Sequence, residues 1–185
     1  MIEKSDVEII ELFNSSDQNR TLALQYIMEK YNRRLYFSVR KIVTSHHDTD
    51  DILQNTLIKL FNSLHSFRNE ASLYTFIYRI ATNEAITTLR KRARERQFVS
   101  ETPIDEFDKI AATEALYDGN TIERELQHAI ATLPEKQRVV FSLRYYDQMP
   151  YKEMSEILET SEGALKASYH LARGKIEIHL KKSLE

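Results

Sequence analysis

Cysteine is absent from this sequence of 185 residues, and glycine and proline are scarce, with three of each. The absence of cysteine excludes a disulfide framework, a zinc site made of thiolates and catalysis by a cysteine nucleophile, and it is consistent with a reducing cytoplasm. Because glycine and proline are the residues that most often interrupt regular structure, their scarcity leaves long stretches free to form helices. The hydrophobic share of 42% and the charged share of 29% are typical of a folded globular chain.

Long apolar runs are missing too. No stretch approaches the roughly 20 consecutive apolar residues that a membrane helix needs, and residues 1–14 lack the basic segment and apolar run of a signal peptide. Phosphate loops, nucleophile elbows and H-E-x-x-H motifs do not occur either. The sequence therefore predicts a cytoplasmic protein without membrane insertion that is not an enzyme, with no catalytic residues and no cofactor.

Charge is small overall but unevenly distributed. The net charge is −2, yet residues 1–96 hold 15 Lys and Arg against 12 Asp and Glu, whereas residues 97–120 hold one against six. Residues 121–185 are balanced, with ten of each sign. A nearly neutral chain with a local basic stripe can still bind DNA, although the free chain is then expected to bind it weakly.

Apolar residues recur every three or four positions in the first half, which is typical of amphipathic helices. Such stripes run over residues 24–42, 52–64 and 73–89. Together with a shorter helix around residues 7–13, they predict a helical bundle over residues 1–96.

The middle of the chain has a different composition. Residues 97–120 combine six acidic residues with Pro103 and Gly119 and contain few large apolar residues at sustained spacing. They predict an acidic linker, with at most an amphipathic turn around residues 107–116.

Helical spacing resumes at Thr121 and continues to the end of the chain. Pro134 and Pro150 suit the first turns of two helices, where the missing proline N–H costs nothing. No stretch shows the alternation of a strand. The predicted fold class is therefore all-α, with two helical bundles joined by a linker and a helix-turn-helix in the second bundle, over residues 121–185.

The strongest chemical signal is a short helix, a tight turn and a longer helix at residues 150–158 and 161–180, which is the pattern of a helix-turn-helix. On a helical wheel, one face of the longer helix is apolar and is expected in the core. The opposite face carries small residues beside cations, which can approach a DNA groove closely. An ordinary helical hairpin with a solvated face is the alternative for this pattern.

A basic run ends the first predicted bundle. Residues 90–96 place five cations within seven positions, where they suit a helix C-terminus and can neutralise phosphates. Arg79 and Asn83 form a polar strip upstream on the same helix. Aromatic rings of the kind that stack on unpaired bases precede this strip: Tyr74, Phe76 and Tyr78. The helical spacing of Phe76 favours a place in the core, and a solvated charged face is the alternative for the basic run.

Histidines and carboxylates are adjacent in residues 46–51, which raises the question of a metal site. Neighbouring residues on a helix point about 100° apart and do not converge readily on one ion, and no second ligand cluster is evident. The segment is expected to start a helix, with Asp48 or Asp50 as its N-cap. No metal site is predicted.

Four segments, in order, resemble the extracytoplasmic-function (ECF) group of the bacterial sigma-70 family of RNA polymerase sigma factors. Residues 48–61 resemble region 2.2, residues 75–86 resemble region 2.3 running into 2.4, residues 133–141 resemble region 4.1, and residues 151–166 resemble region 4.2. The resemblance covers nearly the whole chain. The chain departs from the family at Glu159, where a glycine is frequent, and at Leu171, where a cation is common.

This resemblance implies a sigma factor that directs core polymerase to promoters and helps to open them. The clamp helices of the largest polymerase subunit would meet Asp48, Asp51, Gln54, Asn55 and Lys59. The minus-ten element would meet Arg68, Asn69, Ser72, Arg79, Asn83, Arg90 and Arg92. The minus-thirty-five element would meet Ser161, Gly163, Lys166, Ala167, His170 and Arg173.

Further partners are implied in the same way. The second bundle would contact the flap of the second-largest polymerase subunit, and an anti-sigma factor would compete for the surfaces that polymerase covers. The loop over residues 66–72 would hold a flipped base, which costs little when the duplex is already melting. The acidic linker is expected to thread towards the basic nucleic-acid channel of polymerase.

Two other functions fit parts of the sequence. A helix-turn-helix regulator without a sigma role would need a symmetric dimer to span two half-sites, and it would leave the polar helix at residues 51–59 unexplained. A helical enzyme would use His46, His47 and Asp50 as metal ligands.

Overall fold

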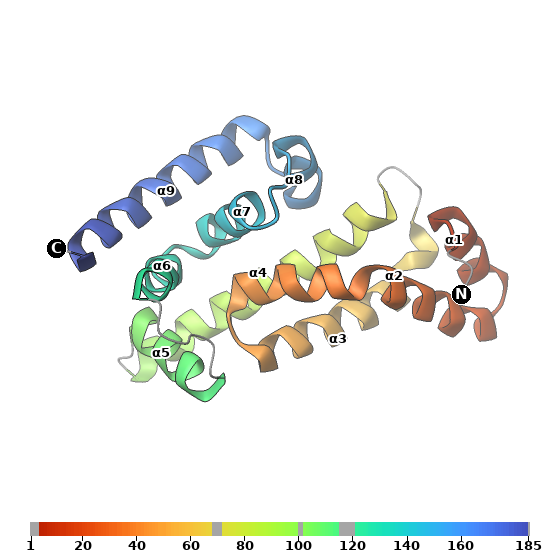
Figure 1. Cartoon of the computed structure of the whole chain (residues 1–185). Coiled ribbons are helices and arrows are strands. Elements are labelled where there is room, and N and C mark those ends of the chain that lie inside the picture. The colour runs from red at the N-terminus through yellow and green to blue at the C-terminus, as the bar shows by residue number, and fades with distance from the viewer. Residues whose placement is uncertain (1–3, 68–71, 100–101, 115–120, 185) are drawn as a thin grey trace.

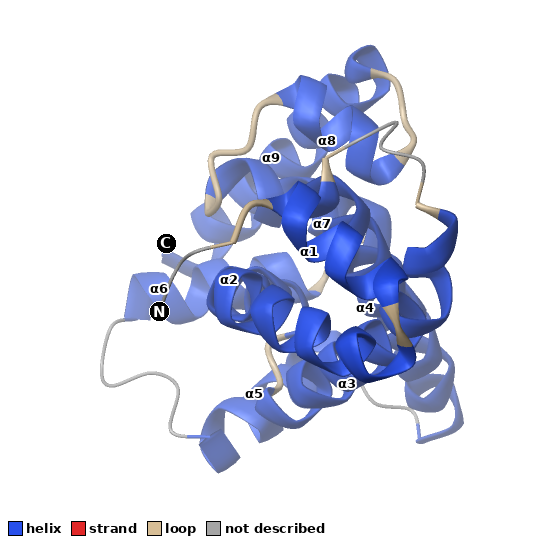
Figure 2. Cartoon of the chain, turned by 90° about the vertical axis from the view of Figure 1, so that its right-hand side faces the viewer, coloured by secondary structure: helices blue, strands red, loops and turns tan. Residues whose placement is uncertain are grey.

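The computed structural model describes residues 4–67, 72–99, 102–114 and 121–184. Over these residues the chain forms nine α-helices, one 3-10 turn and no strand, which confirms the all-α prediction (Figures 1 and 2). The elements are α1 (Asp6–Ser15), α2 (Asp17–Val43), α3 (His46–Ser63), η1 (Leu64–Ser66), α4 (Leu73–Val99), α5 (Pro103–Glu114), α6 (Thr121–Ala131), α7 (Glu135–Tyr145), α8 (Tyr151–Leu158) and α9 (Glu162–Leu184).

Serine hydroxyls cap the first three helices. Ser5, Ser16 and Ser45 each accept a backbone N–H from the first turn of α1, α2 and α3, which satisfies donors that a helix start otherwise leaves unpaired. The N-cap of α3 is therefore Ser45, and the expectation of Asp48 or Asp50 at that position is wrong. Asp48 lies within the first turn, where a carboxylate still complements the helix dipole.

The first bundle packs α2, α3 and α4 side by side, with α1 against α2 (Figure 1). Its core is built from the apolar stripes that the periodicity predicted: Ile27, Leu35, Ile52, Leu60, Ile77 and Leu89 are all buried. No helix among the described residues combines the length and apolar character of a membrane span.

The second bundle contains the helix-turn-helix, formed by α8 and α9. Glu159 ends α8 in the left-handed region, with φ 49° and ψ 42°. The turn thus keeps the conformation that favours glycine even though a side chain is present, at some cost in backbone strain. Ser161 Oγ then accepts the backbone N–H of Ala164 at 3.3 Å and caps α9.

The two bundles pack against each other. α7 contacts α2 and α4, and α8 contacts α4. Val139, Leu143, Met154 and Leu165 of the second bundle belong to the same buried cluster as the core of the first bundle. A separate cluster around Ile176 joins α6, α7 and α9. The hydrophobic effect therefore holds the bundles together in this structure.

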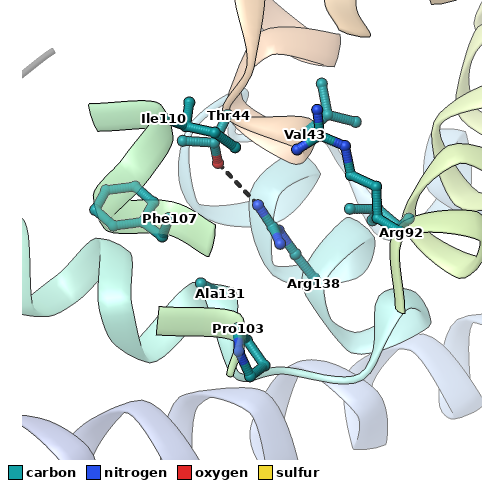
Figure 3. A pocket seen from close by; sticks show the side chains of 9 residues that line it. Val43, Thr44, Arg92, Pro103, Phe107, Ile110, Ala131 and Arg138 are labelled. Carbon is teal, nitrogen blue, oxygen red and sulfur yellow. Dashed lines mark hydrogen bonds between the residues drawn. The ribbon is translucent and has the colours of Figure 1, made fainter. Parts of the chain in front are cut away.

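A helix, α5, occupies part of the expected linker and is longer than the predicted turn suggested. Its Phe107 is buried at a junction with the ends of α2 and α4 and with α7 (Figure 3). At this junction the buried Arg138 of α7 donates a hydrogen bond to Thr44 Oγ1 at 2.8 Å. Thr44 ends α2 in the left-handed region, with φ 69°. The middle of the chain is thus packed against both bundles.

Candidate polymerase and promoter interfaces

α3 turns a polar face to solvent, while its apolar side fills the core. Four of the five predicted polymerase contacts lie exposed on that face: Asp51, Gln54, Asn55 and Lys59. Two of them have polar partners, because Asp51 Oδ2 lies 3.2 Å from His47 Nδ1 and Lys59 forms an ion pair with Glu84 of α4. The face is a set of charged and amide groups on a helix that the core holds rigidly.

Asp48, the fifth predicted polymerase contact, is less exposed than the other four. Its side chain is 13% exposed and pairs with Arg92 of α4 at 2.5 Å. The pair joins the start of α3 to the basic end of α4. Arg92, which was predicted to meet the minus-ten element, is therefore engaged with the first turn of α3.

Three other predicted minus-ten residues lie on the side of α4 that faces the second bundle. Arg79 Nη1 is 2.8 Å from Glu159 Oε1 at the end of α8, and Arg90 Nε is 3.1 Å from Glu135 Oε1 at the start of α7. Asn83 lines a groove whose other wall comes from α7, α8 and α9. The structure brings these residues together, but against the second bundle.

Electrostatics keep the Arg90–Glu135 pair charged. The pKa of Glu135 lies below its ordinary value of 4.5, first because of a hydrogen bond with its own backbone N–H and then because of the hydrogen bond from Arg90. A carboxylate at a helix start is also favoured by the helix dipole.

The loop predicted to hold a flipped base lies largely outside the described residues, and so do Arg68 and Asn69. Ser72 is described and exposed, and its Oγ accepts the backbone N–H of Thr75 at 3.0 Å. Ser72 thus caps the start of α4 on the flank of this loop.

Aromatic rings near the loop do not form one exposed platform. Tyr78 is 2% exposed and its ring lies 4.2 Å from that of Tyr74, which the Arg34 guanidinium covers at 4.4 Å. Burial is the main cause that raises the pKa of Tyr78 to about 12. Phe76 is half-buried against Phe67, with ring centroids 5.1 Å apart, and is the ring of this group beside the loop.

The whole predicted minus-thirty-five set is exposed on α9 and at its capping residue: Ser161, Gly163, Lys166, Ala167, His170 and Arg173. The opposite side is buried through Leu165, Ala172 and Ile176, as the helical wheel predicted. A methyl group added at Gly163 would meet no atom within 4 Å, so the helix surface there is open.

Lys166 and Arg173, on the exposed face of α9, form ion pairs with glutamates of the same helix, and Lys166 Nζ also lies 5.5 Å from the ring centroid of Tyr151 on α8. Lys166 Nζ lies 3.4 Å from Glu162, and Arg173 Nε lies 2.7 Å from Glu177. Exposed pairs one turn apart are worth less than about 1 kcal/mol. Phosphates can therefore displace them readily.

The histidines at the start of α3 point to separate partners. His46 Nδ1 lies 2.5 Å from the Tyr36 hydroxyl and 3.9 Å from Asp50, whereas His47 pairs with Asp51. Among the described residues, the group of three whose metal-binding atoms converge lies elsewhere. The geometry gives no support to an enzyme built on this segment.

Both halves of the chain match known protein families. Residues 27–95 match the model of Sigma-70 region 2, and residues 123–176 match that of Sigma-70, region 4. The chain is 29% identical to the ECF RNA polymerase sigma factor SigW of Bacillus subtilis over 155 residues, which cover 80% of this chain and 83% of the relative. It is 26% identical to the ECF RNA polymerase sigma-E factor of Escherichia coli over 181 residues, which cover 94% and 93%.

Solved structures show the same fold. CnrH, in complex with the cytosolic domain of CnrY, superposes with a TM-score of 0.65 at 19% identity, over 97% of this chain and 99% of that one. The sigma factor RpoE of Bartonella quintana, in complex with the anti-sigma factor NepR, has a TM-score of 0.60 at 20% identity, over 85% and 96%.

A helical fold with a helix-turn-helix and two ordered sigma-70 regions defines a transcription initiation factor. The chain belongs to the sigma-70 family of RNA polymerase sigma factors, and within it to the ECF group. The resemblance seen in the sequence is confirmed. The roles of individual residues stay predictions.

The sequence does not reveal the acidic residues that form ion pairs and hydrogen bonds between the first bundle and the second. Glu135 and Glu159 pair with α4, and Asp147 accepts a hydrogen bond from Ser38 Oγ at 2.6 Å and pairs with Lys41 at 3.2 Å. These partners are 45 to 109 positions apart in the chain. No local sequence pattern predicts pairs between residues so far apart.

Proposed function

We propose that this sigma factor directs core RNA polymerase to specific promoters and helps to open them, and that its two regions divide the work. The observation that carries this proposal is the ordered pair of sigma-70 regions with distinct faces, polar on α3 and, on α9, formed by small residues beside Lys166 and Arg173. In this role the chain binds and positions, while polymerase performs the chemistry. Such a protein works in the cytoplasm, where polymerase meets DNA.

The polar face of α3 is the proposed contact with the clamp helices of the largest polymerase subunit. Asp51, Gln54, Asn55 and Lys59 project from a helix fixed on its other side by the core, and a rigid support makes recognition by several hydrogen bonds effective. Asp48 acts as a positioning residue, because its pair with Arg92 fixes the start of α3 against α4. Region 4 contacts the flap of the second-largest subunit.

The minus-ten element is the proposed ligand of the α4 side that carries Arg79, Asn83 and Arg90. Both arginines are paired with glutamates of the second bundle, and the two regions are proposed to separate when this side receives DNA. A partner that binds only the separated form shifts the population towards it. Core polymerase acts in this way when it holds the two regions at different sites.

Single-stranded DNA is the proposed ligand of the segment before α4. Arg68, Asn69 and Ser72 would hold a flipped base of the non-template strand beside Phe76, which supplies an aromatic surface. The acidic linker is proposed to enter the nucleic-acid channel of polymerase once the regions separate, and α5 would then leave its place at the junction.

Duplex DNA at the minus-thirty-five element is the proposed ligand of α9. Its contact residues are exposed already, and the open surface at Gly163 and Ala167 allows a close approach of the helix to the groove. Lys166 and Arg173 would exchange their glutamate partners for phosphates.

An anti-sigma factor is the proposed regulator. NepR and the cytosolic domain of CnrY are the partners in solved complexes that share this fold. The polar face of α3 and the groove between α4 and the second bundle are surfaces that such a partner can occupy in competition with polymerase.

Transcription in vitro tests the proposal. Core polymerase with this chain should produce transcripts with defined 5′ ends from a library of genomic fragments that includes the DNA upstream of the chain's own gene. Core polymerase alone is the control and should produce none of them. The proposal fails if no specific transcript arises, or if the chain is a stable homodimer that binds palindromic duplex unaided.

A further inference from the structure

Three side chains from two helices converge at one end of the second bundle. Glu125 and His128 lie one turn apart on α6, and His179 faces them from the last part of α9. The helices are held side by side by packing between residues such as Ile130 and Ile176. None of the three side chains takes part in the interfaces described above.

The carboxylate of Glu125 lies between the two imidazoles. Its Oε1 is 3.5 Å from His128 Nδ1, and its Oε2 is 3.5 Å from His179 Nε2. One ligand atom from each residue lies within 4.8 Å of the other two. Zinc binds nitrogen and oxygen ligands at about 2.0–2.2 Å, so ligands of a tetrahedral site are roughly 3.3 Å apart. The two distances of 3.5 Å are close to that value but involve different oxygens of Glu125, so a side-chain adjustment is needed to place one carboxylate oxygen and both nitrogens around one ion.

A carboxylate behind His128 completes the pattern of a metal-binding histidine. His128 Nε2 lies 2.8 Å from Asp108 Oδ1 of α5, and Arg124 also contacts this oxygen at 3.1 Å. A proton on Nε2, donated to Asp108, leaves Nδ1 as a free ligand that points towards Glu125. Histidines that bind zinc usually donate their second ring N–H to such a carboxylate, which fixes the tautomer and raises the basicity of the ligand.

The nitrogen His179 Nε2 supplies an independent indication. This atom is buried and has no hydrogen-bond partner among the described residues. Buried polar atoms are nearly always paired in folded proteins, and an exception calls for an unseen partner such as an ion. The atom also lies on the side of the ring that faces Glu125.

We propose that Glu125, His128 and His179 bind one Zn²⁺ ion, with Asp108 as the outer partner of His128. Two imidazoles and one carboxylate form a donor set that suits zinc and leaves a fourth position for water. The ion would join α6 to α9 and, through Asp108, would hold α5 in place between the two regions. Zinc would thereby stabilise the packed form of the chain.

A zinc titration of the metal-stripped chain tests this site. In competition with a chromophoric chelator, the wild-type chain should bind one equivalent of Zn²⁺. At a free zinc concentration 100-fold above the dissociation constant, the folded-to-unfolded ratio should rise about 100-fold. His179→Ala should weaken binding at least tenfold, and Asp108→Asn should weaken it by about 10- to 100-fold.

Exposed histidines provide the matched control. The double variant His46→Ala/His47→Ala removes two histidines that stand beside carboxylates on α3, and it should leave both affinity and stoichiometry unchanged. Glu125→Gln is a second variant of nearly the same shape, for use if His179→Ala loses helicity without zinc.

Several outcomes would overturn the site. They are the absence of stoichiometric binding, binding that survives both His179→Ala and Glu125→Gln, and binding that disappears in the His46→Ala/His47→Ala control. Variants that destabilise the chain equally with and without zinc would show instead that the cluster is an ion-pair network.

Discussion

The two helices predicted to contact promoter DNA differ in the partners of their predicted DNA-binding residues. On α9 the residues predicted to meet the minus-thirty-five element are exposed, and Lys166 and Arg173 pair with glutamates one turn away. On α4, Arg79 and Arg90 pair with Glu159 and Glu135 of the other bundle. In the proposed roles, the chain presents the face for duplex DNA without contacts to the other bundle, whereas two arginines of the face for melted DNA are paired with that bundle.

Apolar burial and ion pairs contribute differently to the packing of the second bundle against α4. Leu143 and Met154 lie fully buried between the bundles, and burial of a side chain of this size contributes about 1.5–3 kcal/mol. The two ion pairs are partly exposed and contribute less, about 0–1 kcal/mol each. Apolar contact therefore provides most of the stability of the packed form, and the ion pairs fix how the two bundles are positioned relative to each other.

The largest expected effect comes from the core that the bundles share. Leu143→Ala should lower the free energy of unfolding by about 2–5 kcal/mol, because it leaves a cavity against the first bundle. Chemical denaturation measures the change. Leu171→Ala, at a side chain that is 55% exposed, is the control and should change stability by less than about 0.5 kcal/mol. Similar losses in both variants would contradict a shared core.

The open face of α9 gives the second prediction. Lys166→Ala should lower affinity for minus-thirty-five duplex by on the order of tenfold and reduce the salt dependence by about one phosphate contact. Affinity for core polymerase should stay unchanged. Fluorescence anisotropy with each partner measures both values, and Lys181→Ala, near the end of the same helix, is the control. Equal loss of both affinities would show that Lys166 acts on the fold.

The covered face of α4 gives a smaller effect of opposite sign. Glu135→Gln/Glu159→Gln removes the partners of Arg90 and Arg79, and the free chain should then bind a minus-ten single strand a few-fold more tightly, since each pair is worth about 0–1 kcal/mol. Electrophoretic titration without polymerase measures the gain. Glu123→Gln/Glu156→Gln, which also removes two negative charges at exposed positions, should have no effect. An unchanged or weaker affinity in the double variant would mean that the pairs do not restrain α4.

The smallest effect is a pH dependence. The folded chain lowers the pKa of Glu135 below 4.5, so its pair contributes stability that is present above that pH and is lost as pH falls through the folded-state pKa. The melting temperature of Glu135→Gln should therefore lie below that of the wild type at pH 6 and approach it in acid. A difference that is constant with pH would exclude this origin.

Local features of the fold were predictable because the buried face of a helix carries an apolar residue at every third or fourth position. The stripes of α2, α3 and α4 and the exposed face of α9 follow directly from spacing, and so does the helix-turn-helix. The Asp48–Arg92 pair and the arginine–glutamate pairs join residues far apart in the chain, which periodicity does not report. The sequence also does not say that the apolar side of α7 packs on the first bundle.

The candidate zinc site shows the same limit. Glu125 and His128 stand three positions apart, which is visible in the sequence, but the third ligand is on the last helix and the outer carboxylate is in the expected linker. Helix packing alone brings them together.

The distance between the two regions tests the central claim most directly. Because the chain lacks cysteine, spin labels can be placed at Asn62→Cys on α3 and Lys152→Cys on α8, both at exposed positions outside the proposed contacts. We predict one narrow distance distribution in the free chain and a longer distance when core polymerase is bound. A free chain that already shows the polymerase-bound distance would contradict the claim that the second bundle covers the minus-ten face.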